Sequence, residues 1–173
     1  MKKIWLTAAA LLSLLAAPMQ TQAQAPTGKE NPKSSNEQFE QRVVELVNAE
    51  RKKRRLRPLQ VDADLQRAAR YHSCDMAADD YFEHDSHDRK GSRLVSVCET
   101  FDRIEKFAPD FGGSAENISA GNPSPEDVVK GWMDSPGHRK NILNSKYTHI
   151  GVGYCNSGKK GWGHYWTQNF GVK

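Results

Sequence analysis

The sequence lacks the short motifs that identify common hydrolases. It has no HExxH motif, which would place two metal-ligating histidines on one helix. Neither Ser86 nor Ser135 stands in a GxSxG nucleophile elbow, and no cysteine lies in a recognisable nucleophile motif. A local motif therefore assigns no hydrolytic mechanism, and any site must be assembled from residues that are distant in the sequence.

Cysteine is scarce, and its three positions are Cys74, Cys98 and Cys155. Three cysteines form at most one internal disulfide and leave one thiol. The sequence leaves all three pairings open, and of these we favour Cys74–Cys98. None of the three lies near the end of the N-terminal apolar stretch, which argues against a lipid-anchored cysteine at that place.

The chain also has little excess charge of either sign. Its formal net charge is +4, and two of these charges are Lys2 and Lys3, which precede an apolar leader without acidic residues. Without the leader the formal charge is +2. Because a nucleic-acid-binding domain normally carries a pronounced basic surface, the sequence predicts no nucleic-acid partner.

No apolar run is long enough to cross a bilayer. The longest covers residues 4–17 and is soon followed by Pro18 and glutamines. Two lysines before this run and small residues around Ala23 are typical of a secretory signal peptide. We therefore expect export to the periplasm or the medium, with no transmembrane segment in the mature chain. The expected divisions are a signal peptide at 1–23, a disordered polar linker at 24–35 and one folded domain at 36–173.

Hydrophobic periodicity predicts four helices and three strands. Helical spacing covers residues 36–57, 62–79, 92–107 and 124–135. Strand-like alternation covers residues 115–119, 149–155 and 163–170. We expect Ser35 and Gln38 to form a capping box at the first helix, which should end in a solvated basic run at 51–57. His72 lies on the apolar stripe of the second helix, which predicts a structural histidine in the core.

Three titratable residues stand where the chain changes direction. His84 comes just after the second predicted helix. Glu116 alternates with Ile118, so burial of Ile118 carries Glu116 toward the interior. A buried carboxylate must be paired, hydrogen-bonded or neutralised, which indicates a site. His138 follows Pro136, and the residue before a proline leaves the helical region, so His138 should lie just past a helix end.

Three segments resemble the bacterial CAP superfamily, also called the SCP-like extracellular proteins. They are AENIS at 115–119, SPGHRKNIL at 135–143 and YWTQNFG at 165–171. The resemblance extends over residues 39–171. It implies an α+β fold of the CAP type, an α-β-α sandwich in which a small antiparallel sheet lies between helices.

The resemblance also implies a cleft, which in this family is lined by two histidines and two acids. His84 corresponds to the first histidine and Glu116 to the first acid. The places of the second acid and the second histidine hold other residues here, with Asp134 and His164 adjacent to them. In the bacterial branch the histidine of the PGHR motif, His138, lies near the cleft. We take His84, Glu116 and His138 as cleft or metal candidates, and Asp134 and His164 as a second set.

This candidate set supports two interpretations. Two imidazoles and a carboxylate could hold Zn²⁺ or another divalent metal and activate water, with Glu116 as the catalytic group of a protease-like hydrolase. The same groups could instead form a hydrogen-bonded network that supports the cleft. The resemblance implies that binding is more usual than catalysis in this family. We therefore favour a secreted binding module for a lipid, an anionic envelope polymer or a protein partner, and keep the metal-dependent hydrolase as the alternative.

Overall fold

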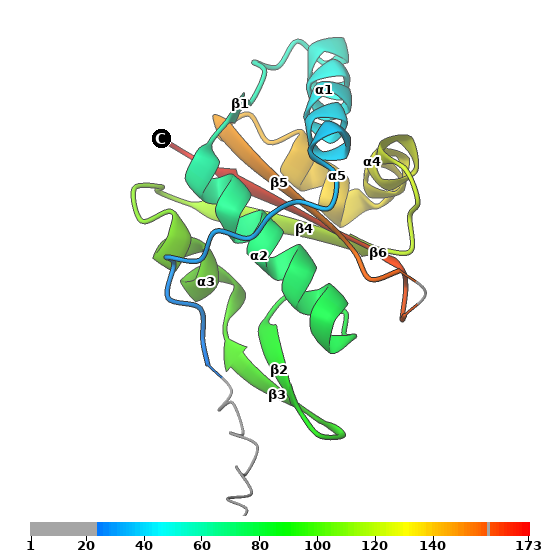
Figure 1. Ribbon diagram of the computed structural model, residues 1–173. Coiled ribbons are helices and arrows are strands. Elements are labelled where there is room, and N and C mark those ends of the chain that lie inside the picture. Colours follow the sequence, from blue (N-terminus) through cyan, green and yellow to red (C-terminus); the bar gives the residue numbers. More distant parts are fainter. Residues whose placement is uncertain (1–23, 159) are drawn as a thin grey trace, which may run out of the picture.

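The computed structural model describes residues 24–158 and 160–173, and the expected signal peptide at 1–23 lies outside them. Helices cover both faces of a central sheet in a mixed α+β fold (Figure 1). The helices are α1 (Glu37–Lys53), α2 (Ala63–Asp79), α3 (Thr100–Phe107), α4 (Pro125–Asp134) and α5 (Pro136–Ile142). The strands are β1 (Gln60–Val61), β2 (Ser86–Lys90), β3 (Arg93–Cys98), β4 (Ser114–Ala120), β5 (His149–Asn156) and β6 (His164–Gly171). No helix among the described residues is long and apolar enough to cross a membrane.

The central sheet has the strand order β1-β5-β6-β4. β6 pairs antiparallel with both β4 and β5, as the CAP-type sandwich implies. The two-residue strand β1 adds a parallel edge beside β5, so the sheet is antiparallel except at this edge. β2 and β3 form a separate hairpin that projects from the α2 side of the molecule (Figure 1).

The two faces of the sheet are covered by different helices, because side chains alternate along each strand. On one face, Tyr154 and Trp166 belong to a buried cluster that includes Val43 of α1 and Trp132 of α4. On the opposite face, Gly151 and Gly153 let α2 lie directly against β5 (Figure 1). The glycines of the IGVG segment therefore set the distance between the helix and the sheet.

Gly153→Ala should lower the free energy of unfolding by about 3 kcal/mol or more, because the added Cβ would overlap the backbone of α2. An alanine Cβ at this position would lie 2.2 Å from the carbonyl carbon of Ala69, which cannot move without displacing the helix. Gly131→Ala in α4 is the matched control, since nothing lies within 4 Å of its added Cβ. It should be stabilising by about 0.5–1 kcal/mol. Urea unfolding measures both, and equal stabilities would contradict the close packing of α2.

The prediction of a helix at 92–107 is wrong for the first half of this range. Residues 93–98 form β3, and α3 begins only at Thr100. Gly91 has φ +62° in the two-residue turn between Lys90 and Arg93, a position where hairpin turns favour glycine. Two of the four apolar residues of this segment, Val95 and Val97, are β-branched, and over so few residues helical and strand spacing are hard to distinguish.

The expected capping box at the start of α1 is also wrong. Asn36, not Ser35, is the N-cap, and its Oδ1 accepts from the backbone N of Phe39 at 3.2 Å. The Ser35 hydroxyl instead accepts from the backbone N of Asn156 at 3.0 Å, at the end of β5. Both residues are good N-caps, so the contact of the chain with β5 decides which of them caps the helix.

The expected basic end of the first helix is too long, and one of its members is buried. α1 ends at Lys53, and Arg51 is fully buried. The Arg51 guanidinium donates to the carbonyl oxygens of Arg57, Ile142 and Asn144 at 2.9, 2.7 and 2.9 Å. It therefore joins α1 to the end of α5 and is not available to an external anion.

The disulfide joins Cys74 of α2 to Cys155 of β5, so the favoured pairing Cys74–Cys98 is wrong. The pair lies where α2 crosses β5, and it fastens the helix to the sheet. Cys98, at the end of β3, is buried as a free thiol.

Residues 24–35, for which we expected a disordered linker, cross the outside of α2 in the structure (Figure 1). Arg67 of α2 donates to the carbonyl oxygens of Gly28 and Glu30 at 3.0 and 3.1 Å. The backbone N of Ser35 then donates to the Tyr154 carbonyl at 3.2 Å. The segment is thus held by hydrogen bonds at its middle and at its C-terminal end.

Candidate functional site

Glu116 occupies the centre of the candidate site and is buried. It lies on β4 directly opposite Asn169 of β6, so its side chain points to the face that α2 covers. Ile118 lies two residues further along the same face and packs against Met76 of α2 and Tyr165. The alternation of β4 therefore places the carboxylate in the interior, as the sequence predicts.

Both oxygens of the Glu116 carboxylate are hydrogen-bonded to protein donors. Arg103 of α3 donates to Oε2 at 2.5 Å, and Nδ1 of His84 donates to Oε1 at 2.9 Å. The side-chain amide of Asn169, oriented so that both of its groups are satisfied, donates to Oε2 at 3.1 Å and accepts from the backbone N of Ala69 at 3.2 Å. The carboxylate is therefore held from three elements.

The charges around Glu116 keep it ionised. Burial by itself raises the pKa of this carboxyl, but the guanidinium of Arg103 and the nearby histidines outweigh burial and lower the pKa below its usual value. Arg103 is itself fully buried and also donates to the His84 carbonyl at 2.9 Å and to the Ser86 hydroxyl at 3.0 Å. The result is a buried ion pair with its remaining donors largely satisfied.

The pKa values of the two histidines next to Glu116 are shifted in opposite directions. The hydrogen bond to Glu116 raises the pKa of His84, whose side chain is about half exposed. Burial, with the charge of Arg103 beside it, lowers the pKa of His72 to about 3. His72 is therefore neutral, and its Nε2 donates to the Glu83 carbonyl at 3.0 Å. This is the structural role that its position on α2 predicts.

His138 lies beside this group without joining it. It is on α5, at the outer edge of β4, and its backbone carbonyl accepts from Asn117 at 3.2 Å. Among the described residues, its ring makes no hydrogen bond to His84 or Glu116. Partial burial and then the charge of His84 lower the pKa of His138, which is consistent with two nearby rings.

The second set of candidates lies elsewhere. Asp134 is exposed at the end of α4, where it pairs with Lys130 at 2.6 Å. Nδ1 of His164 lies 2.8 Å from the Tyr154 hydroxyl, on the face of β6 opposite to Asn169. The structure therefore brings His84 and Glu116 together, places His138 beside them, and leaves Asp134 and His164 outside.

Sequence reasoning missed Arg103 and Asn169. A buried carboxylate must be paired, hydrogen-bonded or neutralised, but the chain has 25 lysines and arginines, and nothing local selects one of them as the partner of Glu116. Strand register, which sets Asn169 opposite Glu116, is likewise unknown before the sheet is assembled.

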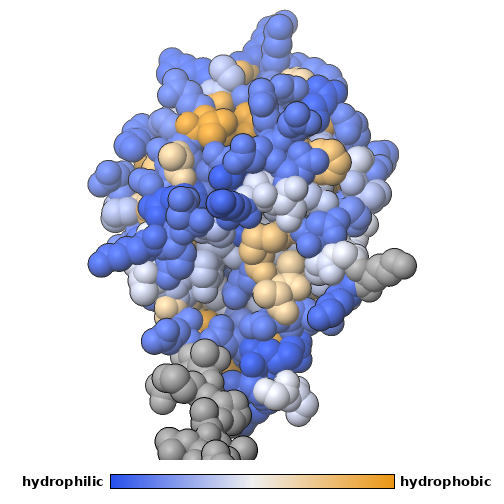
Figure 2. All heavy atoms as spheres, in the orientation of Figure 1, coloured by the Kyte–Doolittle hydropathy of each residue, from blue (hydrophilic) through white to orange (hydrophobic). Residues whose placement is uncertain are grey.

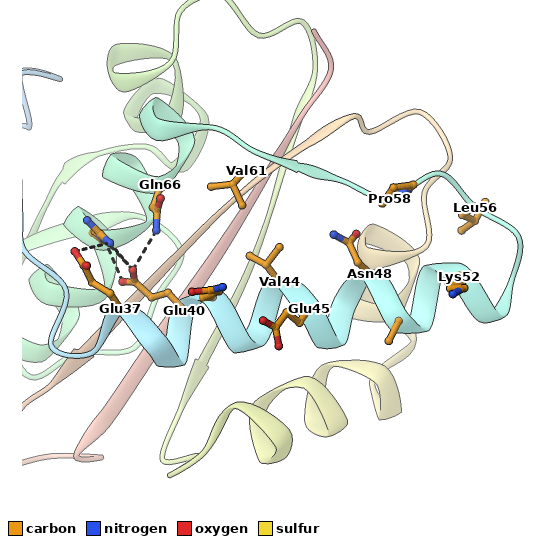
Figure 3. A pocket seen from close by; sticks show the side chains of 13 residues that line it. Glu37, Glu40, Val44, Glu45, Asn48, Lys52, Leu56, Pro58, Val61 and Gln66 are labelled. Atoms are coloured by element: carbon orange, nitrogen blue, oxygen red, sulfur yellow. Dashed lines mark hydrogen bonds and ion pairs between the residues drawn. The ribbon is translucent and has the colours of Figure 1, made fainter.

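Two recesses are relevant to ligand binding. A small one of about 380 Å³ opens beside His84 and is lined by Glu83, His84, Asp85, His87 and Leu94. A larger groove of about 1040 Å³ runs along α1, between this helix and the segment that contains β1 (Figure 3). The lining of the groove includes none of His84, Glu116 and His138, so the groove and the titratable cluster are separate features.

Within the described part of the chain, one group of three or more side chains has the spacing of metal ligands, and it consists of three aspartates. Asp75, Asp79 and Asp88 have ligand atoms within 4.8 Å of one another. This group does not include His84, Glu116 or His138. Asp75 accepts a hydrogen bond from the Tyr81 hydroxyl, and burial raises the pKa of this aspartate to about 6.

Comparison with known proteins places the chain in a family. The model of the cysteine-rich secretory protein family, CAP, matches residues 44–170. The uncharacterized protein YkwD of Bacillus subtilis is 46% identical over 137 residues, which are 79% of this chain and 48% of the relative. The uncharacterized membrane protein YlbC of the same organism is 37% identical over 131 residues, which are 76% of this chain and 34% of the relative. The chain thus spans about half and a third of the length of these two relatives.

Solved structures agree with this grouping. An extracellular protein containing an SCP domain from Bacillus anthracis superposes with a TM-score of 0.67 at 29% identity, covering 83% of this chain and 45% of that one. An outer surface protein of Borrelia burgdorferi superposes with a TM-score of 0.68, covering 83% of this chain and 99% of that one; at 18% identity it shows the shared fold alone. Together with the family match, these similarities show that the chain belongs to the CAP, or cysteine-rich secretory protein, family.

Proposed function

We propose that this chain is a secreted binding module for a lipid, an anionic envelope polymer or a protein partner, and that its His84–Glu116 cluster supports the fold beside the recess. The observation that carries this proposal is that the Glu116 carboxylate already accepts three hydrogen bonds, from Arg103, His84 and Asn169. Secretion is supported by the expected signal peptide and by the similar protein of Bacillus anthracis, which is described as extracellular.

The surroundings of Glu116 argue against its use as a metal ligand. Oε2 of Glu116 already accepts from both Arg103 and Asn169, so a metal at this oxygen would displace one of them, and displacing Arg103 would leave a buried charge without its partner. A catalytic zinc site needs three protein ligands with an open position. His84 and His138 offer at most one ring nitrogen each, and Glu116 is already held by Arg103 and Asn169. The residues present therefore do not fit a zinc site.

One observation favours the alternative, a hydrolase that uses His84, Glu116 and His138. Glu116 accepts from Nδ1 of His84, which leaves Nε2 as the remaining nitrogen of a half-exposed ring beside the small recess. A carboxylate that orients a histidine in this way is also found in general-base catalysis. The described residues place no serine or cysteine nucleophile within hydrogen-bond reach of this ring, so we rank this function second.

The test is metal content and ligand binding of the purified mature protein, beside a His84→Ala/His138→Ala variant. We expect elemental analysis to find no stoichiometric metal in either protein. We also expect co-sedimentation with phosphatidylglycerol vesicles or purified cell-wall polymer, or capture of a peptide ligand. Near-stoichiometric zinc that is lost in a variant with an unchanged circular dichroism spectrum would overturn the binding module in favour of the hydrolase.

A further inference from the structure

The edge of the sheet at β1 has an unused pair of backbone hydrogen-bonding groups. β1 bonds to β5 through alternate residues, with Gln60 N donating to the Thr148 carbonyl and Asp62 N to the Ile150 carbonyl, both at 3.0 Å. The N–H and C=O of Val61 therefore point away from β5. No partner for either group is found within the described residues, and Val61 is 53% exposed.

The side chain of Asn48 in α1 makes, with the backbone of Leu59, the two hydrogen bonds that a neighbouring strand would make at this edge. Its side-chain amide donates to the Leu59 carbonyl at 3.0 Å and accepts from Leu59 N at 2.8 Å. Leu59 and Val61 present their backbone groups to the same side, because they are two residues apart in an extended chain. The backbone groups of Leu59 are thus bonded by Asn48, whereas those of Val61, the next residue on this side of the edge, are open.

This open position faces the large groove along α1. Figure 3 shows Val44 and Asn48 on the helix pointing toward the segment that carries Pro58 and Val61. α1 has 17 residues and is therefore about 25 Å long, a length that about seven extended residues match. In Figure 2 a small hydrophobic patch near β1 is surrounded by hydrophilic residues, as is typical of an apolar interaction site with a polar rim.

The charges along the groove differ between its two ends. The N-terminal half of α1 contributes Glu37 and Glu45, whereas the C-terminal half contributes Lys52 (Figure 3). Both glutamates are well exposed, and each makes one ion pair at the surface, Glu37 with Arg70 at 3.3 Å and Glu45 with Arg42 at 3.1 Å, which water screens strongly. Glu40 between them is buried and paired with Arg70 at 2.7 Å, so it belongs to the fold. An occupant with a basic group at one end and an acidic group at the other complements this arrangement.

We propose that the groove binds an extended polypeptide, which adds to the sheet beside Val61 and lays an apolar side chain against Val44. Its basic end lies over Glu37 and Glu45, and its acidic end or C-terminal carboxylate lies near Lys52. An acyl chain would fill the apolar part but could not use the Val61 N–H and C=O, whereas strand addition uses both. This inference rests on the proposed binding function and names the partner class as polypeptide.

Selection of heptapeptides from a phage-displayed library against the full mature protein tests the proposal. We expect enrichment of peptides with a basic residue toward one end, an apolar centre and an acidic residue toward the other. Synthetic copies should bind Val61→Pro at least about tenfold more weakly, because proline removes the open N–H while remaining compatible with an edge strand. Val61→Thr, which keeps the N–H and the branched shape, should bind like the original chain.

Circular dichroism and thermal unfolding should show that both variants remain folded. Failure to enrich any peptide, or equal binding by Val61→Pro and the original chain, would overturn the inference. If, in addition, vesicles or cell-wall polymer still co-sediment with Val61→Pro, the binding module would stand and only the polypeptide partner would be rejected.

Discussion

Glu116→Gln should lower the free energy of unfolding by about 3–5 kcal/mol, because it leaves the guanidinium of Arg103 buried without a counter-charge. The glutamine side chain keeps the shape of glutamate, so the loss reports the charge and its hydrogen bonds and not a cavity. Arg103 and the Glu116 side chain are both almost completely buried, which limits screening by water. Urea unfolding at neutral pH measures the change.

The control is Asp134→Asn, which removes an equally short ion pair at an exposed position. We expect a change of less than about 1 kcal/mol there. The double variant Arg103→Met/Glu116→Gln provides a second check, since removing both charges should cost less than the sum of the single changes. An unchanged stability in Glu116→Gln would mean that the carboxylate is not a structural partner, and would renew interest in a catalytic role.

Removing the disulfide should have the second large effect. The bridge between Cys74 and Cys155 closes a loop with a sequence separation of 81, for which the chain-entropy model predicts about 4–5 kcal/mol. Cys74→Ala/Cys155→Ala should therefore unfold at a much lower urea concentration than the original chain. Reduction of the original chain with dithiothreitol should shift its unfolding in the same direction.

Cys98→Ala distinguishes the effect of losing the disulfide from the effect of replacing any cysteine. Because Cys98 is a free buried thiol, this variant should remain as sensitive to dithiothreitol as the original chain. The Cys74→Ala/Cys155→Ala protein should show no such sensitivity. If Cys98→Ala alone abolished the effect of reduction, the bridge would instead involve Cys98, the pairing that the sequence alone leads us to favour.

Several features could be predicted because they depend on local periodicity. The alternation of Glu116 with Ile118 predicts a buried carboxylate, and the stripe of α2 predicts that His72 lies in the core. Each end of helix α2 and of strands β4 to β6 lies within one residue of its expected position. In each case the period of the apolar residues already specifies which side of the element faces the interior.

Other features could not be predicted, for identifiable reasons. The apolar spacing of segment 93–98 fits a helix as well as a strand, because six residues do not distinguish the two periods, and the turn at Gly91 decides the matter. Arg51 belongs by composition to a solvated basic run. It is buried because the end of α5 supplies carbonyl oxygens that need a donor.

The family, the main elements and the burial of Glu116, with its need for pairing, hydrogen bonds or neutralisation, follow from the local sequence alone. Three features depend on how distant elements pack: Arg103 pairs with Glu116, Cys155 is the partner of Cys74, and Val61 faces an open groove. The physical reason is the range of the interactions. Periodicity and caps act within a few residues, whereas ion pairs, disulfides and sheet edges depend on which distant elements pack together, and many residues of the same type compete for each place.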